Sequence, residues 1–215
     1  MEAGQENSSA LAELCQLYWQ PVFAFARRSG ANPEDAEDLT QEFFARLIDK
    51  KWLVHADPVR GRFRNWLLAS MKHFLTNEWH RARTQKRGGG AVPEDIDSCG
   101  EIADPSVTPD AAYDVEWAET LLANTLSRLR SGWTHERLTF DDVRGWLPGG
   151  GAEGGFDLVV QRTGMAEGAV KSAVQRLRGK FRETFRAEVV QTLSDPTDAD
   201  DEIRHLGAAL AGRMS

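Results

Sequence analysis

The stretch FDLVVQRTGMAEGAVKSAVQRLRGKFR, from Phe156 to Arg182, decides the fold of the second half of this 215-residue chain. A short apolar segment ends at a turn around Gly164, and a longer segment then carries apolar residues at helical spacing. The side chains expected to pack inward from the longer segment are Ala169, Val170, Val174, Leu177 and Phe181. A short helix, a turn that contains glycine and a longer helix together predict a helix-turn-helix.

The outward face of the longer helix carries side chains that suit DNA. Arg and Gln can make paired hydrogen bonds to the edges of guanine and adenine, and Lys and Arg neutralise phosphate. The residues expected near base edges are Lys171, Ser172, Gln175, Arg176 and Arg178, and those expected near phosphate are Lys180 and Arg182. The alternative is a solvated basic helix with ordinary surface charge.

Helical spacing recurs along most of the chain, and no strand-like alternation of useful length interrupts it. We therefore predict an all-α fold of two helical modules joined by a flexible acidic linker. The first domain is expected over 8–87 and the second over 111–193. The linker, 88–110, is rich in Gly, Pro, Ser and acids, and an acidic tail with a short amphipathic helix follows over 194–215.

An acidic ridge is predicted on a helix of the first domain. Asn32 is expected to cap this helix, with Pro33 at its first position, and DAEDLTQEFF follows from Asp35 to Phe44. The outward residues are Glu34, Asp35, Asp38, Gln41 and Glu42, and the inward ones are Ala36, Leu39, Phe43 and Leu47. Such a ridge complements a basic protein surface, although a merely solvated face is the simpler alternative.

A basic segment with interleaved aromatic residues, RGRFRNWLLASMKHFLTNEWHRARTQKR, runs from Arg60 to Arg87. Cations of this kind can neutralise phosphates while planar rings stack on unpaired bases. Phe63, Trp66 and Phe74 lie at core spacing and are expected to be buried. Trp79 and His80 are the aromatic side chains expected to be exposed.

The net charge of −7 seems to argue against a nucleic-acid partner, but the charges are unevenly distributed. Residues 46–87 hold eleven Lys/Arg against three Asp/Glu, and residues 162–186 hold seven against two. Nine acids and no bases lie in 93–120, and six acids and no bases in 188–202. Because the acidic segments repel phosphate, we expect weak DNA binding by the chain alone and a larger partner that carries it to DNA.

Other functional classes find no support in the sequence. No apolar run reaches eighteen residues and the start of the chain is polar, so we expect a cytoplasmic protein with no membrane segment. The five histidines and the two cysteines, Cys15 and Cys99, show no metal-ligand spacing, and no cofactor is expected. The glycine run 149–154 has no hydrophobic strand before it, so we predict a loop there and no enzyme activity.

These features together resemble the extracytoplasmic-function (ECF) sigma factors of bacterial RNA polymerase, over about Leu11 to Leu193. DAEDLTQEFF is similar to the helix with which that family binds core polymerase. FRNWL, Phe63 to Leu67, with the basic residues after it, is similar to the segment that melts and reads the minus-ten element. GMAEGAVKSAVQRLR, from Gly164, is similar to the helix-turn-helix that reads the minus-thirty-five element.

The resemblance implies a role for individual residues. Docking on the clamp helices of the polymerase β′ subunit is implied for Asp35, Asp38, Leu39, Gln41 and Glu42. The loop from Asp57 to Arg62 and the helix behind it would capture an unstacked base. Minus-ten contacts are implied for Arg62, Phe63, Arg64, Trp66, Lys72, His73, Asn77, Arg81 and Arg83. Minus-thirty-five contacts are implied for Lys171, Ser172, Gln175, Arg176, Arg178 and Lys180.

Three other hypotheses compete with this one. The first is a helix-turn-helix regulator that acts without core polymerase, the second an enzyme with a helix-turn-helix appendage, and the third a helical adaptor that never contacts DNA. An anti-sigma protein or a kinase is a candidate regulator. The tail beyond Leu193 is expected to fold back on a basic DNA-binding surface and lower activity, the alternative being a frayed, solubilising tail.

Overall fold

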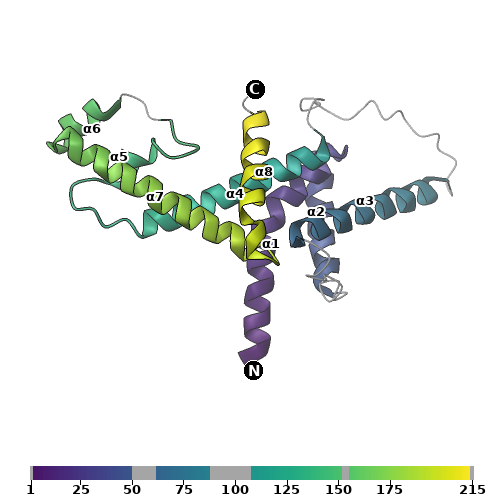
Figure 1. The fold of residues 1–215 in the computed structure, drawn as a ribbon. Coiled ribbons are helices and arrows are strands. Elements are labelled where there is room, and N and C mark those ends of the chain that lie inside the picture. The colour runs from purple at the N-terminus through teal and green to yellow at the C-terminus, as the bar shows by residue number, and fades with distance from the viewer. Residues whose placement is uncertain (1, 50–61, 88–107, 152–154, 214–215) are drawn as a thin grey trace. The chain divides into compact units, whose positions relative to one another are not determined.

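The structure is a computed structural model that describes residues 2–49, 62–87, 108–151 and 155–213. Every regular element in these ranges is helical, as the sequence predicts (Figure 1). The α-helices are α1 Glu2–Arg28, α2 Pro33–Asp49, α3 Phe63–Arg87, α4 Pro109–Ser131, α5 Phe140–Arg144, α6 Gly155–Thr163, α7 Glu167–Gln191 and α8 Ala199–Arg213, with a 3-10 turn over Pro196–Asp198.

The chain divides into two compact units. Unit 1 comprises residues 1–118, 192–194 and 204–215, and unit 2 comprises residues 119–191 and 195–203. Helix α4 contributes its first ten residues to unit 1, although the sequence pattern predicts 111–118 in the second domain. The reason is apolar burial, because Tyr113 and Trp117 are fully buried and Trp117 stacks on Tyr18 of α1 with ring centroids 4.5 Å apart.

Unit 1 is built around α1, α2 and α3. Gly30 lies in the connection between α1 and α2 and has a φ of +103°, a backbone conformation that favours glycine. Asn32 then caps α2 as predicted, since its Oδ1 accepts the backbone N–H of Asp35 at 2.8 Å. Phe43 on α2 packs edge-on against Phe74 on α3 at 5.6 Å. The rest of this core includes Val22, Phe25, Leu47, Leu67, Met71 and Leu75.

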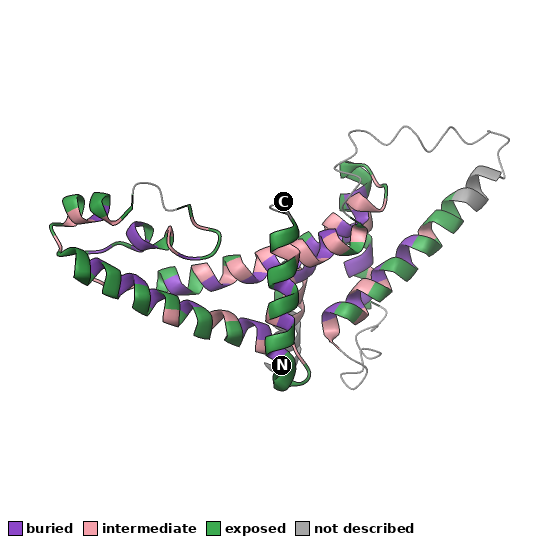
Figure 2. Ribbon diagram, turned by 45° about the horizontal axis from the view of Figure 1, so that its top comes forward, coloured by how far each residue is buried: buried purple, intermediate pink, exposed green. Residues whose placement is uncertain are grey.

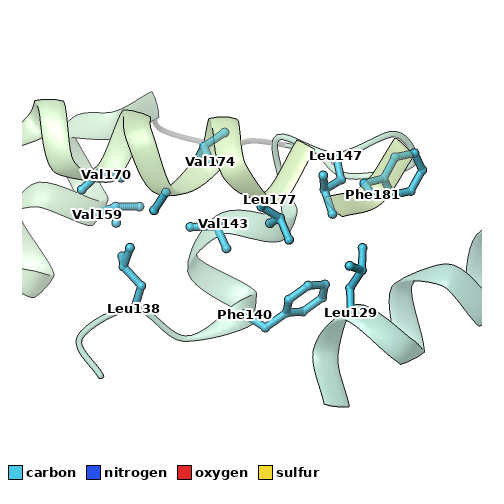
Figure 3. Close-up of a cluster of buried hydrophobic side chains, with 11 residues drawn as sticks. Leu129, Leu138, Phe140, Val143, Leu147, Val159, Val170, Val174, Leu177 and Phe181 are labelled. Atoms are coloured by element: carbon cyan, nitrogen blue, oxygen red, sulfur yellow. The ribbon is translucent and has the colours of Figure 1, made fainter. Parts of the chain in front are cut away.

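Unit 2 has a core shared by α4, α5, α6 and α7 (Figure 3). Thr139 starts α5 with a capping box, in which its side chain and that of Asp142 bond each other's backbone N–H. Gly164, with φ +64°, makes the predicted turn between α6 and α7. The side chains that meet in this core include Leu129, Leu138, Val143, Leu147, Val159, Val170, Val174, Leu177 and Phe181.

One predicted core residue of α7 is misplaced. Ala169 is exposed, and Ala173, which the sequence pattern did not select, is buried instead. Ala169 lies one helical turn before Ala173, in the first turn of α7, where only Val170 is buried. The remaining inward predictions on α7 are confirmed.

The predicted amphipathic helix of the tail is present as α8, which is not frayed over Ala199–Arg213. Leu206 is fully buried, and His205 Nε2 lies 2.9 Å from Oδ2 of Asp114 within unit 1. Within unit 2, Asp200 pairs with Arg186. Neither Asp114 nor Arg186 belongs to the predicted promoter residues, so the inhibitory role of the tail stays a prediction.

Candidate polymerase and nucleic-acid interfaces

The acidic ridge of α2 is exposed in the structure. Its members are Glu34, Asp35, Asp38, Gln41 and Glu42, and all are exposed. Leu39, also predicted to bind polymerase, is half-buried at the edge of the ridge. The ridge is rigid at its start, because Asn32 Nδ2 donates to the Asp35 carboxylate at 2.8 Å. Carboxylates fixed on one helix face can steer a basic partner.

An ion-pair network joins the ridge to helix α3, and sequence reasoning missed it. Arg46 pairs with Glu42 one turn away on α2 and, at 2.7 Å, with Glu78 on α3. Glu78 also accepts from Arg81 at 2.8 Å, and the Arg46 guanidinium lies 5.0 Å from the centre of the Phe74 ring. Burial opposes the charged form of Arg46, but the hydrogen bonds that its guanidinium donates to Glu42 and Glu78 raise its pKa overall.

Helix α3 exposes part of its predicted promoter surface. Lys72, His73, Asn77 and Arg81 are exposed, and Arg62, Phe63 and Trp66 are half-buried. Trp79 is 44% exposed and His80 is exposed, while Phe74 is buried, as predicted. Phe63 and Trp66 were expected to be buried and are only partly so, packed on each other at 5.4 Å. The loop 57–61 and the side chain of Arg83 lie outside the described residues.

Two of the predicted minus-ten cations are engaged by carboxylates of α4. Arg64 is only 6% exposed and pairs with Asp114, while the hydroxyl of Tyr113 donates to the Arg64 carbonyl at 3.2 Å. Lys72 is exposed but pairs with Asp110 at 2.6 Å. As placed, the Arg64 side chain therefore supports the packing of unit 1 and does not face solvent, and a phosphate at Lys72 would share the ammonium with Asp110.

Helix α7 presents a polar outward face, which Figure 2 colours as exposed. All six predicted minus-thirty-five residues are exposed. Lys171 pairs with Glu167 at 2.5 Å, and Ser172 Oγ donates to the Gly168 carbonyl at 2.8 Å. The Nε of Arg178 donates to the backbone carbonyl of Trp146 at 3.1 Å, so this guanidinium is braced against the α5 end of unit 2.

Shifted pKa values mark structural groups and not a reactive centre. Burial raises the pKa of Tyr113 well above its ordinary value, with a smaller contribution from Tyr18. Burial also raises the pKa of the Cys15 thiol, which lowers its thiolate fraction and its reactivity. Across the described ranges, no group of three or more His, Cys, Asp or Glu side chains is placed to hold a metal ion.

No helix in the described part of the chain combines the length and the hydropathy that a bilayer span requires.

Residues 14–85 match the family model described as Sigma-70 region 2. The match covers the second half of α1, all of α2 and nearly all of α3. No curated protein and no solved structure matches the chain.

Proposed function

We propose that the protein is a transcription initiation factor of the sigma-70 family, of the ECF type, that directs core RNA polymerase to promoters. The match of residues 14–85 to sigma-70 region 2 carries this proposal, because the matched helices are those that present the acidic ridge and the basic helix α3. The factor supplies binding and positioning, and the polymerase supplies the chemistry. Its place of action is the cytoplasm, where the polymerase and the promoters are.

The acidic ridge is the proposed docking surface for the β′ clamp helices. Asp38 and Gln41 lie at the centre of the exposed face of α2, with Asp35 and Glu42 beside them. Half-buried Leu39 offers an apolar contact at the edge of the ridge. Carboxylates mainly raise the association rate and fix the register, and desolvated apolar contacts slow dissociation.

Helix α3 is the proposed site of promoter opening. Its second half exposes Asn77, Trp79 and His80 together with Arg81, a set that can stack on and bond to an unpaired base. Extruding a base costs a few kcal/mol, which contacts within the polymerase complex can offset. Arg64 is omitted from this surface because it is buried against Asp114.

Helix α7 is the proposed reader of the minus-thirty-five element. Gln175 and Arg176 have the donors and acceptors to read adenine and guanine in the major groove, and Ser172 lies one turn before them. Arg178 is better placed for phosphate than for a base, since its Nε already donates to the Trp146 carbonyl. The turn at Gly164 and the buried face of α7 hold these side chains on a rigid support.

The test measures complex formation and transcription in one set of variants. Purified protein is mixed with core RNA polymerase, and co-elution and promoter-specific run-off transcription are measured. We expect Asp38→Arg to abolish the complex because it inverts the charge at the centre of the ridge. Glu37→Arg is the matched control, since it makes the same charge change at an exposed position on the flank of α2, and it should leave the complex intact.

A second variant separates polymerase binding from promoter choice. Arg176→Ala should retain the complex and lose discrimination at one base pair, by about 1–3 kcal/mol. Wild-type protein that forms no complex with core enzyme would refute the proposal. Equal loss of the complex in Asp38→Arg and Glu37→Arg would show that the acidic ridge is not the specific docking surface for polymerase.

A further inference from the structure

Unit 2 contains an open hollow of about 290 Å³ between the end of α4 and the middle of α7. The loop 132–135 lines one side, and one flank of α7 lines the other with Arg176 and Lys180. None of its lining residues is acidic. The volume is at the lower limit for a drug-sized ligand and suits a small anion or one group of a larger molecule.

The loop side of the hollow is held in one conformation by its own hydrogen bonds. The indole N–H of Trp133 donates to the Leu138 carbonyl at 2.6 Å. Nδ1 of His135 accepts the backbone N–H groups of Arg137 and Leu138 at 3.2 and 3.1 Å. Because Nδ1 accepts, the neutral His135 ring carries its proton on Nε2, which is then a donor. The ring also stacks on Trp133, with centroids 6.0 Å apart.

The helix side of the hollow supplies two cations. Arg176 and Lys180 lie one turn apart on α7 and are both exposed. Among the described residues the structure pairs neither with a carboxylate, in contrast to Lys171 with Glu167 and Arg186 with Asp200. Two cations and a fixed N–H donor, with no acid among the lining residues, form a surface that can bind an oxyanion.

The order of residues around α7 bears on which oxyanion fits the hollow. A stripe of small or uncharged residues, Gly168, Ser172, Gln175 and Gly179, recurs at helical spacing along the outward face. A Cβ added at Gly168 or Gly179 would meet nothing within 4 Å, so a base edge can approach closely. The cations flank this stripe, with Arg176 and Lys180 on one side and Lys171, Arg178 and Arg182 on the other.

A helix in the major groove points its central stripe at the bases and its two flanks at the phosphate backbones on either side. We propose that the hollow is a phosphate-binding pocket for one backbone phosphate of the duplex that α7 reads, held by His135 Nε2 and Lys180, with Arg176 beside it at the edge of the base-reading stripe. The proposal rests on the proposed function for the position of α7 in the groove. It extends the DNA interface beyond the helix-turn-helix to the loop before α5, and it assigns DNA contact to His135.

The experiment measures promoter-DNA affinity of the full chain in complex with core polymerase, over a range of salt concentrations. Lys180→Gln should weaken binding to all sequences alike and reduce the slope of log K against log[salt] by about 0.9, one phosphate contact. Arg137→Gln is the matched control: it removes one exposed charge from the same loop, outside the hollow, and should leave affinity and slope unchanged.

The role of His135 Nε2 as a donor is tested with His135→Asn. The Asn amide oxygen can still accept the backbone N–H groups, but Asn has no donor at the position of Nε2. Affinity should fall about tenfold at pH 8 with the salt slope unchanged, since a neutral donor releases no counterion. The melting temperature checks that unit 2 is intact. His135→Gln, whose amide reaches further, should recover part of the loss.

Wild-type affinity in both His135→Asn and Lys180→Gln would overturn the proposal. Inorganic phosphate, titrated into the free protein and followed by the NMR signals of the His135 ring, is the second arm. Saturable binding of phosphate together with unchanged DNA affinity of the variants would assign the pocket to a free anion and also overturn it. If no complex with core polymerase forms, the proposed function fails, and the same variants are compared on duplex DNA at low salt, where the pocket is tested alone.

Discussion

Helices α3 and α7 are both basic, but their cations differ in what they contact. On α3, Arg64, Lys72 and Arg81 are paired with carboxylates of Asp114, Asp110 and Glu78. On α7, Arg176 and Lys180 face a hollow without an acid among its lining residues. A basic sequence pattern therefore covers two kinds of cation, those that already pair within unit 1 and, on α7, two that face a hollow without an acid.

The comparison has a functional consequence if both helices bind promoter DNA. A phosphate at Lys72 has to compete with the Asp110 carboxylate, whereas no acid lines the hollow beside Arg176 and Lys180. We therefore expect the α7 surface to engage DNA first and the α3 surface to engage it only where polymerase binding and strand opening supply further contacts. Such an order matches the expectation from the sequence that the chain alone binds DNA weakly.

The largest expected effect is on the free energy of unfolding, when the most buried of these cations, Arg64, is removed. Arg64→Ala leaves Asp114, whose side chain is 19% exposed, with the His205 ring but without its guanidinium partner, and it should lower the free energy of unfolding of unit 1 by about 3 kcal/mol. Arg176→Ala, at an exposed position, should change it by less than about 0.5 kcal/mol. Urea denaturation measures both, and equal values would show that Arg64 is an ordinary surface cation.

A smaller effect is expected where the carboxylate is exposed. Asp110→Asn removes the acid that pairs with Lys72, and because the pair is about half exposed, stability should change by no more than about 1 kcal/mol. Binding of the full chain to a promoter fork at low salt should improve several-fold and lose this gain at high salt. The double variant Asp110→Asn with Lys72→Gln is the control and should show no gain.

The smallest effect is expected at an exposed pair of unit 2. The hydrogen bond from Arg130 lowers the pKa of Asp141 below its ordinary 3.8. Since the folded pKa is the lower one, the pair contributes stability above the ordinary value and loses it as pH falls through the folded pKa. Asp141→Asn should therefore lower the stability slightly at neutral pH, where the pair is charged, and leave it unchanged at low pH, so that the acid limb of the stability curve is flatter. A steeper acid limb in the variant would contradict this sign.

Sequence alone predicts those parts of the fold that depend on local chemistry. The cap at Asn32 and the turn at Gly164 each depend on residues within a few positions of one another. The exposed ridge of α2 follows from helical periodicity in the same way. Interactions between near neighbours in the chain are therefore enough to predict these features.

What sequence could not predict depends on partners distant along the chain. Within its own segment, Arg64 resembles a DNA-binding cation. It is buried in an ion pair because the fold brings Asp114, fifty residues later in the chain, into contact with it. The bridge from Arg46 to Glu78 and the hollow beside His135 likewise join separate helices or loops. Periodicity states which face of a helix is buried and says nothing about which element covers it.

The stacking of Tyr18 on Trp117 has a consequence for the order of events during synthesis. About one hundred residues separate the two rings, so the ribosome must make all of unit 1's first three helices before Trp117 can cover Tyr18. Buried Leu206 and the contact from His205 to Asp114 add the last helix to the same unit. The nascent chain thus exposes the Tyr18 ring until more than half of the chain has been made, and a chaperone that binds such surfaces has its longest opportunity on this half of the protein.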